Sequence, residues 1–476
     1  MNAIARTTLL ALIGAALSGC AAIGEKYQRP EVGLPANWQG QPVAAETMAW
    51  PDREWWKAFR SEELDRLIAR AQSNNYDLQA AAARVAQARA NSQIASAGLY
   101  PSVTLDAGAA RVKASGGGGS GVNAFSIAPR VSYEVDIWGR NRYTADAAEA
   151  ALLSSRYAQD VVALTLTADV AAGYFQILSF NDRIQVAYDN LANAKRLMTL
   201  IEAQKAAGKV SAVEVERQRT QVASAEAAIP PLLQGRQVAR DALAVLLGSN
   251  PGELALPEAS LRPVGTPVVP LGLPSLLLER RPDVRQAEAD LISANADIGA
   301  ARAALFPRLD LSARGGFAAT SLRLLGDSGT GFYTIGLDLL ATIFDGGRLS
   351  GQVDVARGRK EELVANYKQS IVSAFRDVED ALVGIEQFAL QEQAQQEVVV
   401  HAREAYRLAE IRYKAGAADY SEVLDAQRTL ISAEAALDPV RFSRFSSIVG
   451  LYRALGGGWD DAAKTAAATD GSTPRP

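Results

Sequence analysis

Alternating apolar and polar residues mark four short segments of the chain as β-strands. The alternation is clean in residues 125–137, 308–317 and 333–343, and weaker in residues 102–110. A period of two predicts strands with one apolar and one polar face. Such strands fit a membrane barrel with lipid outside and water inside, and equally an antiparallel sheet on a soluble core. Pro129 cannot donate to a ladder, so we expect a bulge there or a strand that begins later.

Two long segments carry apolar residues at alternating steps of three and four, from Tyr157 to Leu178 and from Val364 to Phe388. This heptad-like spacing indicates coiled-coil helices. Residues 142–207 form a run of 66 without proline. As a helix rising about 1.5 Å per residue, the run would reach roughly 100 Å. A soluble coiled-coil rod has the same periodicity, so this pattern leaves that alternative open.

The predicted helices and strands occur twice along the chain, and the two copies are offset by about 207 residues. Each copy predicts a helix, two strands joined by a loop, a very long helix, a turn and a second helix. Four landmarks in the same order indicate an internally duplicated chain. The paired landmarks are the helix starts at Asn75 and Arg281, the prolines Pro101 and Pro307, the hairpin turns at Gly208 and Gly416, and the helix ends near Gly248 and Gly456.

The first twenty residues are an export signal rather than part of the fold. Arg6 precedes a short apolar run over 7–17, which is too short to span a bilayer. The run ends at Cys20 in Leu-Ser-Gly-Cys, which resembles a bacterial lipobox. We expect cleavage before Cys20 and the addition of N-acyl and S-diacylglycerol chains, which together anchor a protein stably. An ordinary signal peptide with a chance cysteine is the alternative.

The amino-acid composition excludes most kinds of catalytic and metal-binding sites. The 476 residues carry a net charge of −4, one histidine, His401, and one cysteine, Cys20. No intrachain disulfide and no Cys/His cluster can form, although His401 could pair between subunits. The mildly acidic balance without a basic block argues against a nucleic-acid partner. No nucleophile motif, P-loop or metal cluster supports an enzyme or a cofactor other than covalent lipid.

The mature chain has no stretch of 18 residues free of charge after residue 22, and the best candidate, 161–178, contains Asp169. We therefore predict no transmembrane helix, and any span must use strands closed into a barrel. Four strands cannot close one, because common outer-membrane barrels have at least about eight. Several chains must then share a barrel, with outer loops at 116–119 and 322–330.

Four segments resemble the TolC/OprM-like outer-membrane efflux lipoproteins, the NodT-type outer-membrane factors of RND-type tripartite pumps. The likeness runs from the signal peptide to about Gly456, and the combination of motifs is highly specific. The segments are Tyr-Gln-Arg-Pro at 27–30, Ser-Tyr-Glu-Val-Asp-Ile-Trp-Gly-Arg at 132–140, the mid-chain signature over 272–285, and Ile-Phe-Asp-Gly-Gly-Arg at 343–348.

This resemblance implies a mainly α fold with a membrane β-barrel. Three chains would share a 12-stranded barrel, four strands from each, continued by a helical tunnel with a mixed equatorial belt. The implied domains are the signal peptide 1–19, a lipid-anchored equatorial segment 20–60, the first repeat 61–248, an equatorial linker 249–275, the second repeat 276–456 and a disordered tail 457–476.

The resemblance also implies a passive exit duct in the outer membrane that extends into the periplasm. Its partners would be two further copies, a periplasmic membrane-fusion adaptor, an inner-membrane RND transporter and outer-membrane lipid. The cargo would be drugs or other small toxic compounds. A metal-ion duct of the same architecture and a coiled-coil envelope scaffold remain as alternatives. An open porin is disfavoured, because porins use short periplasmic turns.

The gate is expected at the periplasmic tip, near the turns at Gly208 and Gly416. Glu422 and Asp425 match acidic residues that narrow the pore in the family, and they lie three apart on one helix face. Rings of carboxylates favour cations. This chain has Ser421 where relatives often carry Leu, which argues against an apolar seal at that level.

The resemblance further assigns a latch that closes the tip. Tyr413 and Arg412 match hydrogen-bond donors of the family on one side, and Glu214 matches an acceptor on the other. We therefore predict a Tyr413–Glu214 hydrogen bond that breaks on opening. An exposed coiled-coil surface would carry the same residue types, so the residues alone do not decide this role.

Overall fold

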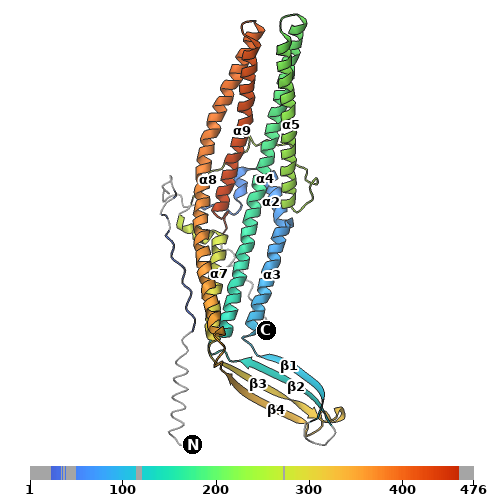
Figure 1. The fold of residues 1–476 in the computed structure, drawn as a ribbon, viewed down its shortest axis with the longest axis vertical. Helices are drawn as coiled ribbons and strands as arrows, with labels where there is room; N and C mark the ends of the chain where they lie inside the picture. Colours follow the sequence, from blue (N-terminus) through green and yellow to red (C-terminus); the bar gives the residue numbers. More distant parts are fainter. Residues whose placement is uncertain are drawn as a thin grey trace. The chain divides into compact units, whose positions relative to one another are not determined.

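A computed structural model describes residues 23–33, 35, 38, 50–113, 121–271 and 274–459 of the chain (Figure 1). The predicted signal peptide, Cys20, the first outer loop at 116–119 and most of the predicted tail lie outside these ranges. Residues 457–459 of the predicted tail lie within the described ranges, and the Trp459 indole Nε1 donates to Asp160 at 3.1 Å.

The elements of the first repeat follow the predicted order. A 3-10 turn, η1 (Trp55–Phe59), precedes it. The repeat over 61–248 contains α2 (Glu62–Asn74), α3 (Tyr76–Ala97), β1 (Ser102–Val112), β2 (Val122–Glu134), α4 (Arg140–Ala206) and α5 (Ala212–Leu246).

The second repeat has the same order. The short η2 (Pro274–Leu276) and α6 (Leu277–Arg280) lead into α7 (Pro282–Ala303), β3 (Arg308–Ala319), η3 (Leu322–Leu324), β4 (Gly331–Leu340), α8 (Arg348–Lys414) and α9 (Tyr420–Ala454). Matching helices have equal lengths: 22 residues in α3 and α7, 67 in α4 and α8, and 35 in α5 and α9. The duplication predicted from the sequence is confirmed.

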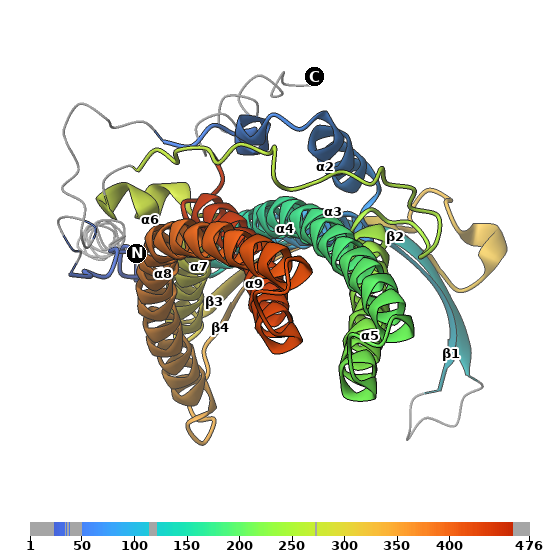
Figure 2. The same ribbon diagram turned by 90° about the horizontal axis from the view of Figure 1, so that it is seen from above.

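The structure separates into two compact units that cut across the repeats. Unit 1 takes residues 1–32, 83–157 and 285–369, and unit 2 takes 33–82, 158–284 and 370–476. Each unit therefore draws on both copies. Unit 1 holds the sheet, and unit 2 holds the turns of both helical hairpins, in which α5 lies beside α4 and α9 beside α8 (Figure 2).

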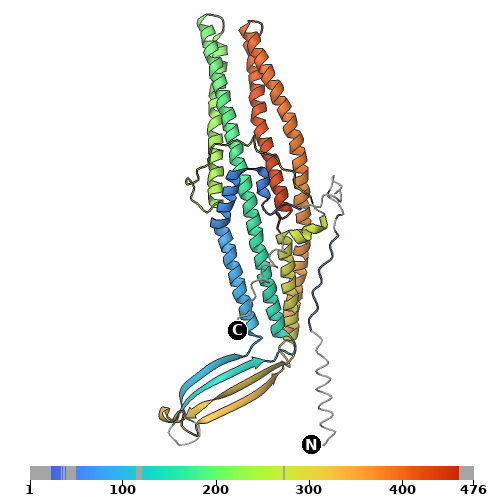
Figure 3. The same cartoon turned by 180° about the vertical axis from the view of Figure 1, so that it is seen from behind.

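The four strands form one antiparallel sheet in the order β1-β2-β3-β4 (Figure 3). Its register places odd-numbered residues on one face and even-numbered residues on the other. The odd face is apolar and open, with Leu105 66% exposed and Ile335 72% exposed. Beneath the sheet edge, Trp138 stacks on Phe306 at 4.8 Å and donates to the carbonyl of Pro307.

Pro129 lies inside β2 without a bulge, so both alternatives predicted there are wrong. The strand begins at Val122, earlier than predicted, and ends at Glu134. The pairing with β3 skips Ala128 and Pro129 but resumes in the same register at Arg130. The physical reason is that proline removes one donor without adding a residue, so the ladder loses bonds while the alternation of faces is kept.

An aromatic cluster forms the main core of unit 2. The ring of Trp55 stacks on Tyr452 at 4.7 Å, and Phe175 packs against Phe59 and Phe445 with centroids 4.8 and 5.1 Å away. Apolar residues of the predicted linker 249–275 pack around it. This core holds the root of both helical hairpins and so fixes the base from which the predicted gate extends.

One helix of the described residues, α4, is long and apolar enough over 18 residues to cross a membrane. This helix contains Asp169, so the finding does not conflict with the prediction that no 18-residue stretch is free of charge. Half of that window is buried inside the chain, and Phe175 within it belongs to the aromatic core. Packing in a protein core accounts for its composition.

Candidate functional site

Both predicted hairpin turns are confirmed, and they close in the same way. Gly208 and Gly416 have φ of +70° and +72°. Beyond each, the next residue bonds back to the carbonyl five residues earlier, Lys209 to Gln204 at 2.9 Å and Ala417 to Arg412 at 2.8 Å. This is the Schellman pattern, in which glycine supplies the left-handed residue. The turns lie at the free ends of the two hairpins, at the top of Figure 1.

The two helices that leave these turns begin differently. In α5, Ser211 and Glu214 form a capping box, in which the Glu214 carboxylate accepts from the Ser211 N–H at 2.6 Å. Glu422 occupies the equivalent position of α9, 208 residues later. It instead accepts from Arg412 Nη1 at 2.7 Å. The two copies of the repeat therefore use the equivalent glutamate differently. Glu214 caps α5, whereas Glu422 forms an ion pair with Arg412.

The tip has a hydrophobic core of its own, built from all four long helices. Ile201 of α4, Val215 of α5, Ala409 of α8 and Val423 of α9 are buried in it, with Tyr413 and Tyr420 beside them. The two tyrosine rings lie 6.1 Å apart. The tips of both hairpins are thus joined by packing within a single chain.

Two tyrosine–glutamine hydrogen bonds cross this core from one hairpin to the other. The Tyr413 hydroxyl donates to Gln204 Oε1, and the Tyr420 hydroxyl to Gln218 Oε1, both at 2.6 Å. Gln218 is fully buried and also donates to the carbonyl of Ala194 at 2.7 Å. Each bond links an element of the first repeat with one of the second.

The predicted Tyr413–Glu214 hydrogen bond is replaced in this structure. Tyr413 bonds Gln204, since Glu214 is held in its capping box. Glu214 still acts on Tyr413 through its charge, because burial first and then the Glu214 carboxylate raise the pKa of Tyr413. Burial raises the pKa of Tyr420 to about 12. Both hydroxyls therefore remain protonated donors at neutral pH.

The predicted constriction residues lie close to this core but outside it. Ser421, Glu422 and Asp425 are all exposed in the single chain. Arg412 neutralises Glu422, whereas the Asp425 carboxylate forms no ion pair with any residue in the described ranges. The two carboxylates thus differ: Asp425 carries a free charge, and Glu422 shares its charge with an arginine of the same hairpin.

Sequence reasoning missed Gln204, Gln218 and Tyr420. A usable signal was the asymmetry of the repeat. Tyr413 and Tyr420 flank the second turn, whereas the equivalent positions of the first turn hold Lys205 and Ala212. Their hydrogen-bond partners could not be chosen from the sequence, since many glutamines lie on these helices.

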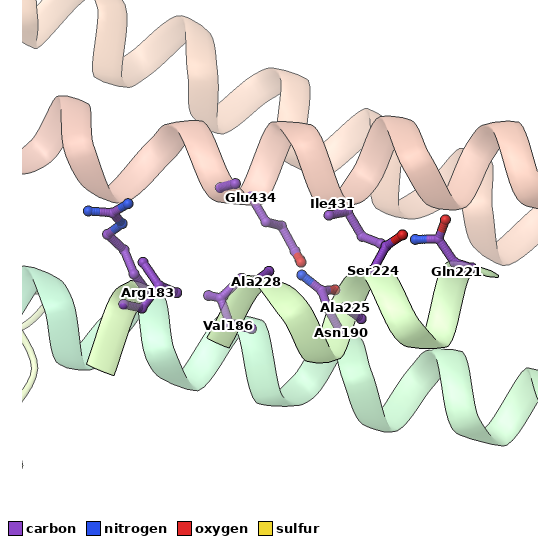
Figure 4. A pocket seen from close by; sticks show the side chains of 12 residues that line it. Arg183, Val186, Asn190, Gln221, Ser224, Ala225, Ala228, Ile431 and Glu434 are labelled. Carbon is purple, nitrogen blue, oxygen red and sulfur yellow. The ribbon is translucent and has the colours of Figure 1, made fainter. Parts of the chain in front are cut away.

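A cavity of about 340 Å³ separates the hairpins farther from the tip. Its wall comes from α4, α5 and α9, including Asn190, Ser224 and Ile431 (Figure 4). Glu434 at its edge pairs with Arg403 at 2.6 Å. The hairpins are therefore packed together at the tip, while space remains between them toward the root.

Comparison with known proteins agrees with this architecture. The sequence pattern of the outer membrane efflux protein family matches residues 67–249 and 273–457, one match in each repeat. The pyoverdine export outer membrane protein OpmQ of Pseudomonas putida is 39% identical over 442 residues, 90% of this chain and 93% of OpmQ. The toluene efflux pump outer membrane protein TtgF of the same species is 36% identical over 466 residues, 94% of this chain and 96% of TtgF.

A solved structure gives the same result. The open state of the Neisseria gonorrhoeae MtrE outer membrane channel superposes with a TM-score of 0.83 at 29% identity, over 92% of this chain and 98% of MtrE. The repeat, the sheet and the hairpins are therefore features of a shared fold rather than of this chain alone. The chain belongs to the outer membrane efflux protein family, whose members act in the outer membrane.

Proposed function

We propose that three copies of this chain form a passive exit duct through the outer membrane, closed at its far end by the helical tip. The observation that carries this is the four-stranded sheet with two open edges. Within the described residues β1 and β4 each pair on one side only, and the odd face exposes large apolar side chains. In lipid every backbone group needs a partner, so the edges must meet those of other chains. Three chains would supply twelve strands.

The duct would work within a tripartite pump. A periplasmic membrane-fusion adaptor and an inner-membrane RND transporter would deliver cargo to the tip, and the transporter would supply the energy. Acyl chains on Cys20 would anchor each copy to the outer membrane beside the barrel. The names of the relatives, which include pumps and export proteins, support this assignment.

The gate would lie at the tip. Asp425 of each copy would project toward the threefold axis, so three free carboxylates would narrow the pore and favour cations. Ser421 and Glu422 would lie at the same level. Opening would move one hairpin against the other, which requires the hydrogen bonds of Tyr413 and Tyr420 to break. Arg412 and Glu214 would steady the turns on either side.

Small organic compounds are the proposed cargo, because relatives are named for the export of pyoverdine and toluene. A strain deleted for the gene should become sensitive to antibiotics, solvents or detergents. Wild-type protein should restore growth, and Cys20→Ala should restore less. Sensitivity confined to copper, silver, zinc or cobalt salts would instead favour the alternative, a metal-ion duct.

The duct itself is tested with purified full-length protein. We expect a trimer by mass in detergent and single-channel currents in a planar bilayer. A protein that stays monomeric and carries no current would contradict the proposal and would favour an envelope scaffold.

A further inference from the structure

The polar face of the sheet carries its charges in separate layers. The register aligns Glu134, Asp310 and Asp338 across three neighbouring strands. Two residues along each strand the next layer contains Ser132 and Ser312. Because a strand rises about 3.4 Å per residue, each layer lies roughly 7 Å from the next.

The layer beyond the serines is cationic. Arg130 of β2 lies directly opposite Arg314 of β3, and Thr104 and Thr334 flank the pair on the outer strands. Directly opposed residues have Cβ atoms about 5 Å apart, and like charges at such positions destabilise a sheet. The pairing of β2 with β3 therefore does not explain why Arg130 and Arg314 lie opposite each other.

The carboxylate layer has arginine partners of its own. Arg140 Nε donates to Glu134 at 3.0 Å, and Arg308 Nε donates to Asp310 at 2.7 Å. Both arginines come from the side of the layer away from the serines. Glu134 and Asp310 are thus neutralised by these arginines, and within the described residues no carboxylate of this layer forms an ion pair with Arg130 or Arg314.

The paired guanidiniums lack a counter-ion. Over the described part of the chain, neither Arg130 nor Arg314 forms an ion pair. Asp106 is the nearest carboxylate on this face by register, diagonal to Arg130, and it forms none either. Arg314 lies over the ring of Phe332, with its Cζ 5.5 Å from the centroid. Both side chains are exposed, so their donors are free for a solute.

We propose that Arg130 and Arg314 form an anion-binding layer inside the barrel that takes organic carboxylates on their way out. This rests on the proposed function, since only a closed barrel turns the polar face into a water-filled lumen. Two arginines from each of three copies would give six guanidiniums in one layer. Arginine presents a planar fork that binds carboxylates through two parallel hydrogen bonds, and rings of arginine favour anions in pores.

The layer would complement the proposed tip. In the proposed duct, the carboxylates of Asp425 would favour cations at the tip, whereas the arginine layer would lie inside the barrel, beyond the layer that holds Ser132 and Ser312. A carboxylate-bearing cargo delivered past the open tip would bind at this cationic layer. Apolar cargo would not use the layer at all.

The test is block of single-channel current in a planar bilayer by citrate, added on the barrel side of full-length trimers in KCl. We expect citrate to reduce the wild-type current in a concentration-dependent manner. The variant Arg130→Gln, Arg314→Gln should need about tenfold more citrate for the same block, since each lost bond is to a charged group. Sucrose at the same concentrations is the uncharged control probe.

Arg111→Gln is the matched control variant, because Arg111 lies on the odd face of the same sheet. It should keep wild-type block although it removes one positive charge from each chain. A wild-type channel that conducts without citrate block, block that is unchanged in the double variant, or equal block by sucrose would overturn the inference. A wild-type protein that stays monomeric in detergent and carries no current would mean that the proposed duct itself is wrong.

Discussion

The hydroxyl of Tyr420 lies 2.6 Å from Oε1 of Gln218, and both side chains are almost completely buried. This hydrogen bond joins the first helix turn of α9 to α5 across the core of the tip. A second bond, from Tyr413 to Gln204, lies beside it. The two hairpins are therefore held together by polar contacts with defined geometry, and not only by apolar packing.

Tyr420→Phe should loosen the tip. The variant leaves the buried Gln218 oxygen without its donor, which costs about 1–3 kcal/mol. Hydrogen exchange of backbone amides in α5 and α9 next to the turns should accelerate roughly five-fold to a hundredfold. Tyr406→Phe is the control, since Tyr406 is buried in the same core and its hydroxyl has no hydrogen bond within the described residues. Equal exchange in both variants would show that the bond does not hold the tip.

Alkaline pH should release the same contact. The pKa of Tyr420 is raised from 10.0 to about 12 in the folded protein. A raised folded pKa contributes stability that is complete below pH 10 and is lost as the pH rises through about 12. An ultraviolet titration of tyrosine ionisation should therefore contain a late step near pH 12. That step should be missing from Tyr420→Phe, and its persistence there would assign it to another tyrosine.

The two carboxylates at the tip should contribute unequally to ion selectivity. Asp425→Asn should reduce the preference of the channel for K⁺ over Cl⁻ several-fold, because its charge has no ion-pair partner in the described chain. Glu422→Gln should have a smaller effect, since Arg412 lies 2.7 Å from that carboxylate. Reversal potentials in a salt gradient measure both. Selectivity that is equal in the two variants and the wild type would contradict an acidic constriction.

Adjacent glycines in β3 should respond very differently to alanine. A Cβ at Gly316 would overlap the Ile127 carbonyl and Ala128 of the neighbouring strand, whereas at Gly315 the nearest atom would be 3.6 Å away. Gly316→Ala should therefore push β2 and β3 apart and cost about 1–3 kcal/mol. The fraction of protein recovered as assembled oligomer from outer membranes should fall for Gly316→Ala and stay normal for Gly315→Ala. Normal assembly of both would mean that the strands can shift without loss.

Much of the fold followed from local patterns. Period two, heptad spacing and the duplicated landmarks predicted the strands, the long helices and both hairpin turns, because these features depend on neighbouring residues in the chain. The effect of Pro129 was predicted wrongly. Its missing N–H donor leaves the register of β2 unchanged, because the neighbouring strands on both sides set that register. The contact between Trp459 and Asp160 could not be predicted, because the two residues lie about 300 residues apart in the sequence.

The candidate site was only partly predictable. Local sequence predicted both turn glycines and placed Tyr413, Glu422 and Asp425 beside the second turn, because a turn is specified by the residues that form it. The pairing of Tyr413 with Gln204, the ion pair of Glu422 and the position of Arg130 opposite Arg314 came from the folded structure alone. These relationships depend on strand register and on the packing of helices about 200 residues apart, and no local pattern encodes the distance between their side chains.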